Sequence, residues 1–159
     1  MKMFKLIIMA ISMMSFTSFV SAKEKLSKTT QTQMIKALEL NEELHMSYFK
    51  YDAAKIEKSR DQVLAALSKV NDKKLQDKLA KAIKYLKEIK KSNRLEDNNK
   101  YYHFANVFLI QLINKFDFGP KYQAYYCPMV RKKWIQNVSK MEKVHNPYDS
   151  SMPHCGGRL

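Results

Sequence analysis

The chain has 159 residues, with 29 Lys and Arg against 15 Asp and Glu, a formal net charge of +14, and only two cysteines. This length suits one domain with a buried core of its own. The sequence has neither a phosphate-binding glycine loop nor a nucleophile–base pair nor paired carboxylates on an apolar face, and we therefore expect a protein that is not an enzyme.

Residues 1–22 have the pattern of a cleaved signal peptide. Lys2 and Lys5 precede an apolar run from Leu6 to Val20, and Val20-Ser21-Ala22 provides the small residues that a signal peptidase recognises. The run is shorter than the roughly 20 residues of a membrane span, which argues against an uncleaved anchor, and no cysteine is placed for a lipid anchor. We expect an exported protein, periplasmic or secreted, whose mature residues 23–159 form one domain without a membrane span.

Loss of Lys2 and Lys5 with the signal takes the net charge from +14 to +12. Export makes nucleic acid an unsuitable partner, and two interpretations of the excess lysines remain. They either attract anionic membrane surfaces and acidic protein partners or only solvate the polar faces of helices.

Residues 30–117 are predicted to be helical, and no glycine or proline interrupts residues 23–118. Apolar residues recur there at helical spacing in four stretches. The first helix runs from about Thr30 to Lys50, the second begins near Asp52, the third follows the Asn71-Asp72 break, and the fourth begins near Glu96 or Asp97. Because the connections are short, neighbouring helices should pack antiparallel.

Residues 118–159 form a tail that is irregular and rich in aromatic and turn residues. Its large side chains favour burial against the helices over free solution: Tyr122, Tyr125, Tyr126, Trp134 and Tyr148. A short helix fits within residues 131–144. The sequence thus predicts an all-α fold, an up-down bundle of about four helices with the tail packed on it.

Both cysteines fall in this tail, each with a methionine close by, in Cys127-Pro128-Met129 and Met152-Pro153-His154-Cys155. Thiolate and thioether sulfurs are soft donors that suit Cu(I). Pro128 favours an extended Cys127, which would point the Cys127 and Met129 sulfurs the same way, and one tight turn would join Met152 to Cys155. We predict a Cu(I) site formed by Cys127, Met129, Met152 and Cys155, with His154 as an optional ligand and His145 and His103 as further candidates.

Two cysteines in an exported protein are also what a disulfide requires. A Cys127–Cys155 bond would close a loop and, in the chain-entropy description, raise the free energy of unfolding by roughly 3–4 kcal/mol. The methionines would then only fill gaps, and His45 and His103 would be packed, hydrogen-bonded side chains. The spacing of the residues leaves both alternatives open.

Several short motifs occur in a characteristic order: Tyr126-Cys127-Pro128-Met129, Trp134-Ile135, Asn146-Pro147-Tyr148 and Met152-x-x-Cys155-Gly156. Together they resemble domain of unknown function 3347, a family of exported bacterial proteins that also occurs as an appendage of heavy-metal efflux adaptors of the copper/silver type. The resemblance spans about residues 38–156 and implies a periplasmic helical domain linked to soft metals. The chain departs from the family at Asp149-Ser150-Ser151 and at Pro153-His154.

We therefore expect a periplasmic protein that binds Cu(I) or Ag(I), as a chaperone or buffer beside an efflux component of the cell envelope. The alternative is a helical adaptor, stapled by a Cys127–Cys155 disulfide, that binds a partner or the envelope surface through its basic face and uses no metal.

Overall fold

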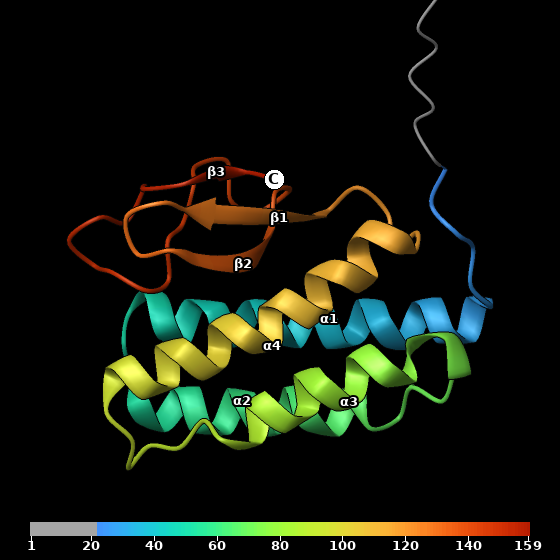
Figure 1. Cartoon of the computed structure of the whole chain (residues 1–159), viewed down its shortest axis with the longest axis horizontal. Coiled ribbons are helices and arrows are strands. Elements are labelled where there is room, and N and C mark those ends of the chain that lie inside the picture. Colours follow the sequence, from blue (N-terminus) through green and yellow to red (C-terminus); the bar gives the residue numbers. More distant parts are fainter. Residues whose placement is uncertain (1–21) are drawn as a thin grey trace, which may run out of the picture.

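The structure, a computed structural model, describes residues 22–159, and the predicted signal peptide lies outside these residues apart from Ala22. Four helices follow one another, α1 (Lys28–Phe49), α2 (Ala53–Leu67), α3 (Lys73–Lys87) and α4 (Leu95–Lys115). They run alternately in opposite directions, and α4 crosses the others at an angle (Figure 1). The four predicted helices are thus confirmed, with ends that differ from the predicted ones by a few residues.

Two of the helices begin where an aspartate satisfies the first free backbone N–H groups. The Asp52 carboxylate accepts a hydrogen bond from the Lys55 N–H at 3.0 Å, and the Asp72 carboxylate accepts one from the Lys74 N–H at 2.9 Å. Apolar side chains at helical spacing then meet in one core, and its fully buried members include Met34, Leu44, Ile56, Val63, Leu75, Leu86 and Tyr102.

A small antiparallel sheet follows the helices, in the strand order β2-β1-β3. Its strands are β1 (Tyr122–Cys127), β2 (Lys132–Asn137) and β3 (Gly157–Arg158). The all-α prediction is therefore wrong, because the described chain is 53% helical and 12% strand. The predicted short helix within residues 131–144 is also wrong, because β2 occupies the first part of that segment.

The hairpin forms because the segments on either side of the Pro128 turn pair in register, from Tyr122 opposite Asn137 to Cys127 opposite Lys132. Aromatic residues fit a pleated, half-buried surface well, which makes this pairing favourable. β2 is the strand that packs on α4, and its Trp134 is fully buried. The tail thus packs on the helices, as the burial of its aromatic residues suggested.

Helices α1–α4 all fall short of the combined length and hydrophobicity that a membrane span requires, as far as residues 22–159 are concerned.

Candidate functional site

The two cysteines meet although they lie 28 positions apart in the sequence. Cys127 ends β1 and is fully buried, whereas Cys155 is half-buried in the turn that leads into β3. Their Cα atoms lie 5.6 Å apart and their sulfur atoms are joined in a disulfide, so the described residues hold no free cysteine. The fold therefore brings together two of the soft donors that the sequence singled out.

Met152 and Cys155 share one tight turn, as predicted, because the Cys155 N–H donates a hydrogen bond to the Met152 carbonyl at 3.1 Å. The Met152 side chain is half-buried. Its thioether therefore belongs to the same short segment as one of the two cysteine sulfurs.

Met129 departs from the prediction that its sulfur would face the same way as that of Cys127. β1 ends at Cys127 and the hairpin turn begins at once, so the extended run assumed for Cys127-Pro128-Met129 does not exist. Met129 is 70% exposed while Cys127 is 0% exposed. The four predicted sulfur donors are therefore not enclosed in one buried pocket.

Gly156 allows the cysteine-bearing turn to approach the hairpin closely. Its φ angle is +138°, a conformation that residues with a Cβ rarely adopt. A Cβ added there would lie 2.7 Å from the Trp134 ring and 3.0 Å from the Tyr126 carbonyl oxygen. The backbone at Gly156, next to Cys155, therefore packs directly against the Trp134 ring.

Three polar side chains that the sequence did not single out as functional hold the loop between β2 and β3. The buried Gln136 amide donates to the Met141 and Lys143 carbonyls and accepts from the His145 N–H. Asn146 donates to the Met152 carbonyl at 3.1 Å and accepts from the Tyr148 N–H. The Tyr148 hydroxyl donates to the Lys133 carbonyl at 2.6 Å. Asn146 and Tyr148 belong to the Asn146-Pro147-Tyr148 motif of the sequence analysis, whereas Gln136 carried no signal there.

His103 is engaged elsewhere, in fixing the sheet to α4. Its Nδ1 accepts the Lys133 N–H at 2.9 Å, and Asn106, one turn later, accepts the Ile135 N–H at 3.1 Å. Burial of the ring lowers the pKa of His103. The role of a packed, hydrogen-bonded histidine therefore fits His103 better than that of a ligand.

The other histidines form a row from the surface into the core. His154 is exposed and its Nδ1 lies 2.7 Å from the Val144 carbonyl oxygen, whereas His145 is half-buried and stacks on Phe49 with a 4.6 Å centroid separation. His45 on α1 is completely buried. Ring centroids are 6.3 Å apart for His154 and His145, and 6.5 Å apart for His145 and His45.

His45 lacks the hydrogen bonds that the sequence analysis expected for it. Both of its ring nitrogens and Nδ1 of His145 are buried without a partner among the described residues. Burial, reinforced by the nearby His145, lowers the pKa of His45 to about 3, and burial and His154 lower that of His145. Both rings are therefore neutral near pH 7 and keep a free lone pair.

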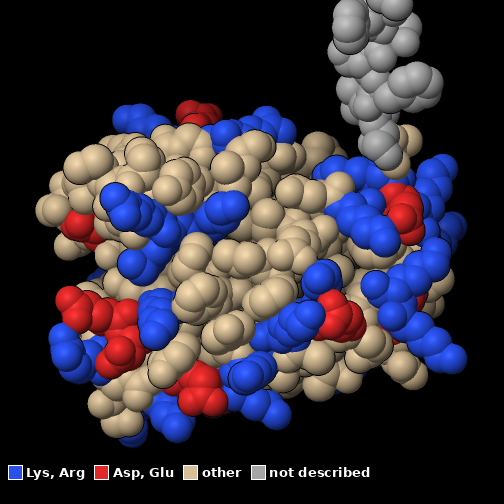
Figure 2. All heavy atoms as spheres, viewed as in Figure 1, with Lys and Arg blue, Asp and Glu red and all other residues tan. Residues whose placement is uncertain are grey.

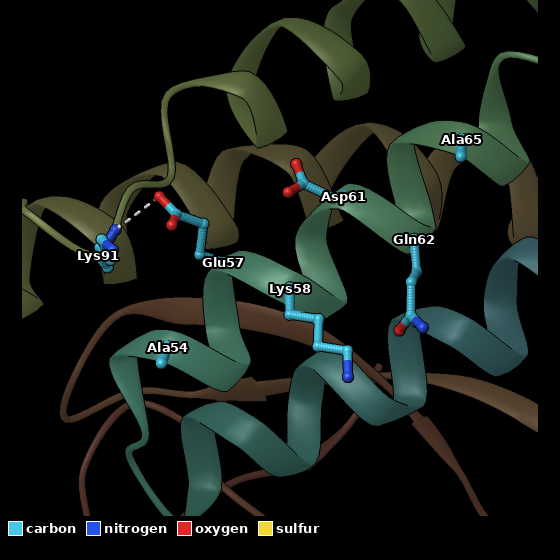
Figure 3. Close-up of a pocket in the computed structure, with 7 residues that line it drawn as sticks. All are labelled: Ala54, Glu57, Lys58, Asp61, Gln62, Ala65 and Lys91. Carbon is cyan, nitrogen blue, oxygen red and sulfur yellow. Dashed lines mark hydrogen bonds between the residues drawn. The ribbon is translucent and has the colours of Figure 1, made fainter.

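A hollow along α2 carries the other notable gathering of charged groups (Figure 3). Glu57 and Asp61 point to one side of the helix, and Lys58 and Gln62 point to the other. The Glu57 carboxylate accepts the Lys91 N–H at 3.1 Å, so one of these carboxylates already has a backbone partner. The Arg60 guanidinium lies 2.9 Å from the Asp61 carboxylate and 3.6 Å from that of Glu57, so both acids of the hollow lie beside a positive charge.

The donor groups of this region limit which metal ions it could hold. Within residues 22–159, no group of three or more His, Cys, Asp or Glu side chains is placed to hold a metal ion. Two sulfurs in contact, with a thioether in the adjoining turn, fit a soft monovalent ion of low coordination number once the disulfide is reduced.

Comparison of this chain with protein-family models, curated proteins and solved structures finds no match. The assignment to domain of unknown function 3347 therefore stays a prediction from the motifs.

Proposed function

We propose that the protein is an exported carrier or buffer of Cu(I) or Ag(I), which binds the ion as cargo through the reduced Cys127 and Cys155. The observation that carries the proposal is the contact between these two sulfurs, made by segments 28 residues apart. Thiolates bind soft monovalent ions strongly, and after reduction of the disulfide the two neighbouring side chains can rotate apart and bind one ion between their sulfurs.

The surroundings of the two sulfurs support this proposal. Cys127 is shielded from water, Cys155 is partly accessible, and Met152 offers a thioether from the adjoining turn. His154 precedes Cys155 at the exposed surface, where an ion arrives first. Met129 stands in solvent and is left out of the proposed ligand set, which differs in this respect from the sequence prediction.

Binding and disulfide formation exclude each other, because the disulfide consumes both thiolates. Opening it takes two electrons and two protons, which a dithiol of the cell envelope supplies by exchange. The oxidised and reduced proteins are then the empty and the cargo-competent forms of the same site. The motif resemblance to an exported family linked to copper and silver efflux adds to the proposal.

Competition between the reduced protein and a chromogenic Cu(I) chelator tests the proposal. Cys127→Ser should weaken Cu(I) binding by about a hundredfold and Met152→Leu by about tenfold, because both lose a soft donor. Met129→Leu is the matched control and should leave the affinity unchanged. Submicromolar binding that survives Cys127→Ser would contradict the proposed site.

A second candidate function is favoured by the disulfide itself, which fastens the tail without any metal. In this case the protein is a stapled adaptor for an anionic envelope surface. α1 and α3 begin at the same end of the molecule, where Thr30 donates to Asp72 at 3.3 Å, and exposed lysines gather there: Lys23, Lys25, Lys28, Lys73 and Lys74. Figure 2 shows basic side chains most densely at that end, with few acidic ones between them.

Intact mass and vesicle binding separate the two functions. The adaptor should retain its disulfide under mild reductant, take up no Cu(I), and bind vesicles that contain phosphatidylglycerol. Replacement of Lys73 and Lys74 by Glu should abolish that binding, because each lysine near an anionic surface contributes about 1 kcal/mol. Uptake of Cu(I) by the reduced protein with no vesicle binding would exclude the adaptor.

A further inference from the structure

We propose that the groove between α1 and α2 binds a medium-chain carboxylate, with the hydrocarbon chain on an apolar floor and the head group between Lys36 and Lys69. The groove has a volume of about 510 Å³, and it is lined by α1 from Thr32 to Leu40 and by α2 from Gln62 to Lys69. It shares no residue with the disulfide or with the basic end of α1 and α3, so the inference is independent of the proposed function.

The groove has an apolar floor because α2 carries short side chains there. The two helices pack against each other, and α2 contributes the consecutive alanines Ala65 and Ala66 to the groove that Leu40 of α1 also lines. Leu40 and Ala66 are partly buried and pack on the hydrophobic core, so the core reaches the surface at this point. Methyl and methylene groups are thus left between longer polar side chains, and covering them with a hydrocarbon chain is favourable.

The charged side chains that line the groove are all positive. Lys36 comes from α1 and Lys69 from α2, and no described carboxylate lines the groove with them. Lys69 takes part in none of the ion pairs of residues 22–159, and Lys36 has only the exposed Glu39, 3.4 Å away. Such an exposed pair contributes little, so Lys36 is able to turn toward a ligand. The groove therefore complements an anionic head group.

The acidic residues of α2 point away from the groove. Figure 3 shows Glu57 and Asp61 on one side of α2 and Lys58 and Gln62 on the other, and Gln62 lines the groove. The Arg60 guanidinium lies 2.9 Å from the Asp61 carboxylate and 3.6 Å from that of Glu57. Both acids are therefore paired with a cation outside the groove and do not oppose an anion within it.

The dimensions and polar groups of the groove favour a single chain with a carboxylate head. From Thr32 to Leu40 the lining covers just over two turns of α1, or about 12 Å of helix. The volume falls within the range of small-ligand sites, roughly 300–1,000 Å³. The hydroxyl of Thr32 and the amides of Gln33 and Gln62 also line the groove, and such groups donate hydrogen bonds to carboxylate oxygens.

An NMR titration of the isotope-labelled, disulfide-bonded and metal-free protein with sodium decanoate, below its micelle concentration, tests the inference. We expect one equivalent to bind and to shift the amide resonances of residues 32–40 and 62–69. Affinity should rise about twofold to fourfold with each methylene added between octanoate and decanoate, because the chain is buried. Decyltrimethylammonium, with the same chain and a positive head, should bind about tenfold more weakly. No shifts with decanoate, or equal affinity for the two amphiphiles, would overturn the inference.

Matched variants assign the groove. Lys36→Gln/Lys69→Gln should weaken decanoate binding by about tenfold, because both cations beside the head group are lost. Lys84→Gln/Lys87→Gln removes two exposed lysines of α3 that do not line the groove, and it should bind as the parent protein does. Ala65→Leu keeps both groove lysines, suits a helix, and fills part of the floor, so it should also weaken binding by about tenfold. Unchanged affinity in the first or the last of these variants would contradict the proposed site.

Further measurements separate this groove from the other proposals. Lys73→Glu/Lys74→Glu, which should abolish vesicle binding by the adaptor, should leave decanoate binding unchanged, because neither lysine lines the groove. Loss of decanoate binding in that variant would mean that the amphiphile binds the basic end, and would overturn the inference. An acidic amphipathic helical peptide that shifts the groove amides when decanoate shifts none would assign the groove to a protein partner instead. Failure of the reduced protein to bind Cu(I) would contradict only the proposed function.

Discussion

The helices and the tail bury similar kinds of side chain but are stabilised in different ways. In the helices, the same contact is repeated: an apolar residue returns every third or fourth position, and the helix starts are satisfied by Asp52 and Asp72. In the tail, each contact occurs once: the disulfide, the close approach at Gly156 and the amides of Gln136 and Asn146.

This difference determines where the molecule tolerates substitutions. Loss of one apolar contact in the helices leaves its neighbours in place, whereas loss of one polar bond in the tail leaves a buried group without a partner. Substitutions of the buried polar side chains of the tail should therefore lower the free energy of unfolding more, per atom altered, than substitutions on the surface of the helices.

Acidification should have the largest effect, and it acts where tail and helices meet. Because the pKa of His45 is lowered to about 3 in the folded protein from 6.5, the unfolded chain binds the proton more readily. Stability from this group is complete above pH 6.5 and is lost as the pH falls toward 3, by about 4–5 kcal/mol. Urea unfolding of the metal-free protein at several pH values measures it. His45→Leu should flatten this dependence, and an equally steep curve in that variant would contradict the assignment.

Removal of the disulfide should come next. The Cys127→Ser/Cys155→Ser variant should lose about 3–4 kcal/mol of unfolding free energy, because the loop closed by the bond is then open in the unfolded chain. Hydrogen exchange should quicken in β1, β3 and the loop between β2 and β3 before it quickens in α2 and α3. Uniform quickening in all elements would show that the tail has no stability of its own.

Gly156→Ala should lower the free energy of unfolding by about 1–3 kcal/mol. The new methyl group would meet the Trp134 ring, and alanine would be strained at the φ angle of this position. Gly157→Ala is a close control, since a Cβ there has nothing within 4 Å. Thermal unfolding followed by Trp134 fluorescence compares the two. Equal midpoints for both variants would mean that the turn can move away from the indole.

Asp52→Ala should have the smallest effect. It should lower the free energy of unfolding by about 1 kcal/mol, because the capping hydrogen bond from the Lys55 N–H is lost. Asp61→Ala, on the exposed side of the same helix, should cost less than half as much. Chemical denaturation resolves this difference. A larger cost at Asp61 would reverse the expected order.

The helices could be predicted because their signals are local. Periodicity and a capping aspartate lie within one segment, so Asp52 and Asp72 mark helix starts without knowledge of the rest of the fold. β2 could not be recognised in this way, since Trp134 to Asn137 are buried consecutively and show no alternation. α4 covers one face of this strand and the following loop helps to cover the rest, and neither contact is visible in its own sequence.

The candidate site was predictable only in part, for the same reason. The pairing of Cys127 with Cys155 follows from an even count of cysteines, and the Met152–Cys155 turn follows from their spacing. The exposure of Met129 depends on where β1 stops. The unpartnered nitrogens of His45 depend on which side chains of the tail arrive above α1, which no pattern within α1 records.

His103 and Asn106 accept hydrogen bonds from the N–H groups of Lys133 and Ile135 on the outer strand β2. These bonds affect self-association. An outer strand with free N–H groups can recruit an extended segment of another molecule and so start fibril growth. Here a helix occupies those donors with side chains, and the opposite border of the sheet is only two residues long. Resistance to cross-β polymerisation thus rests in part on two residues of a helix, and their replacement would leave Lys132 and Lys133 as the only protection within the strand itself.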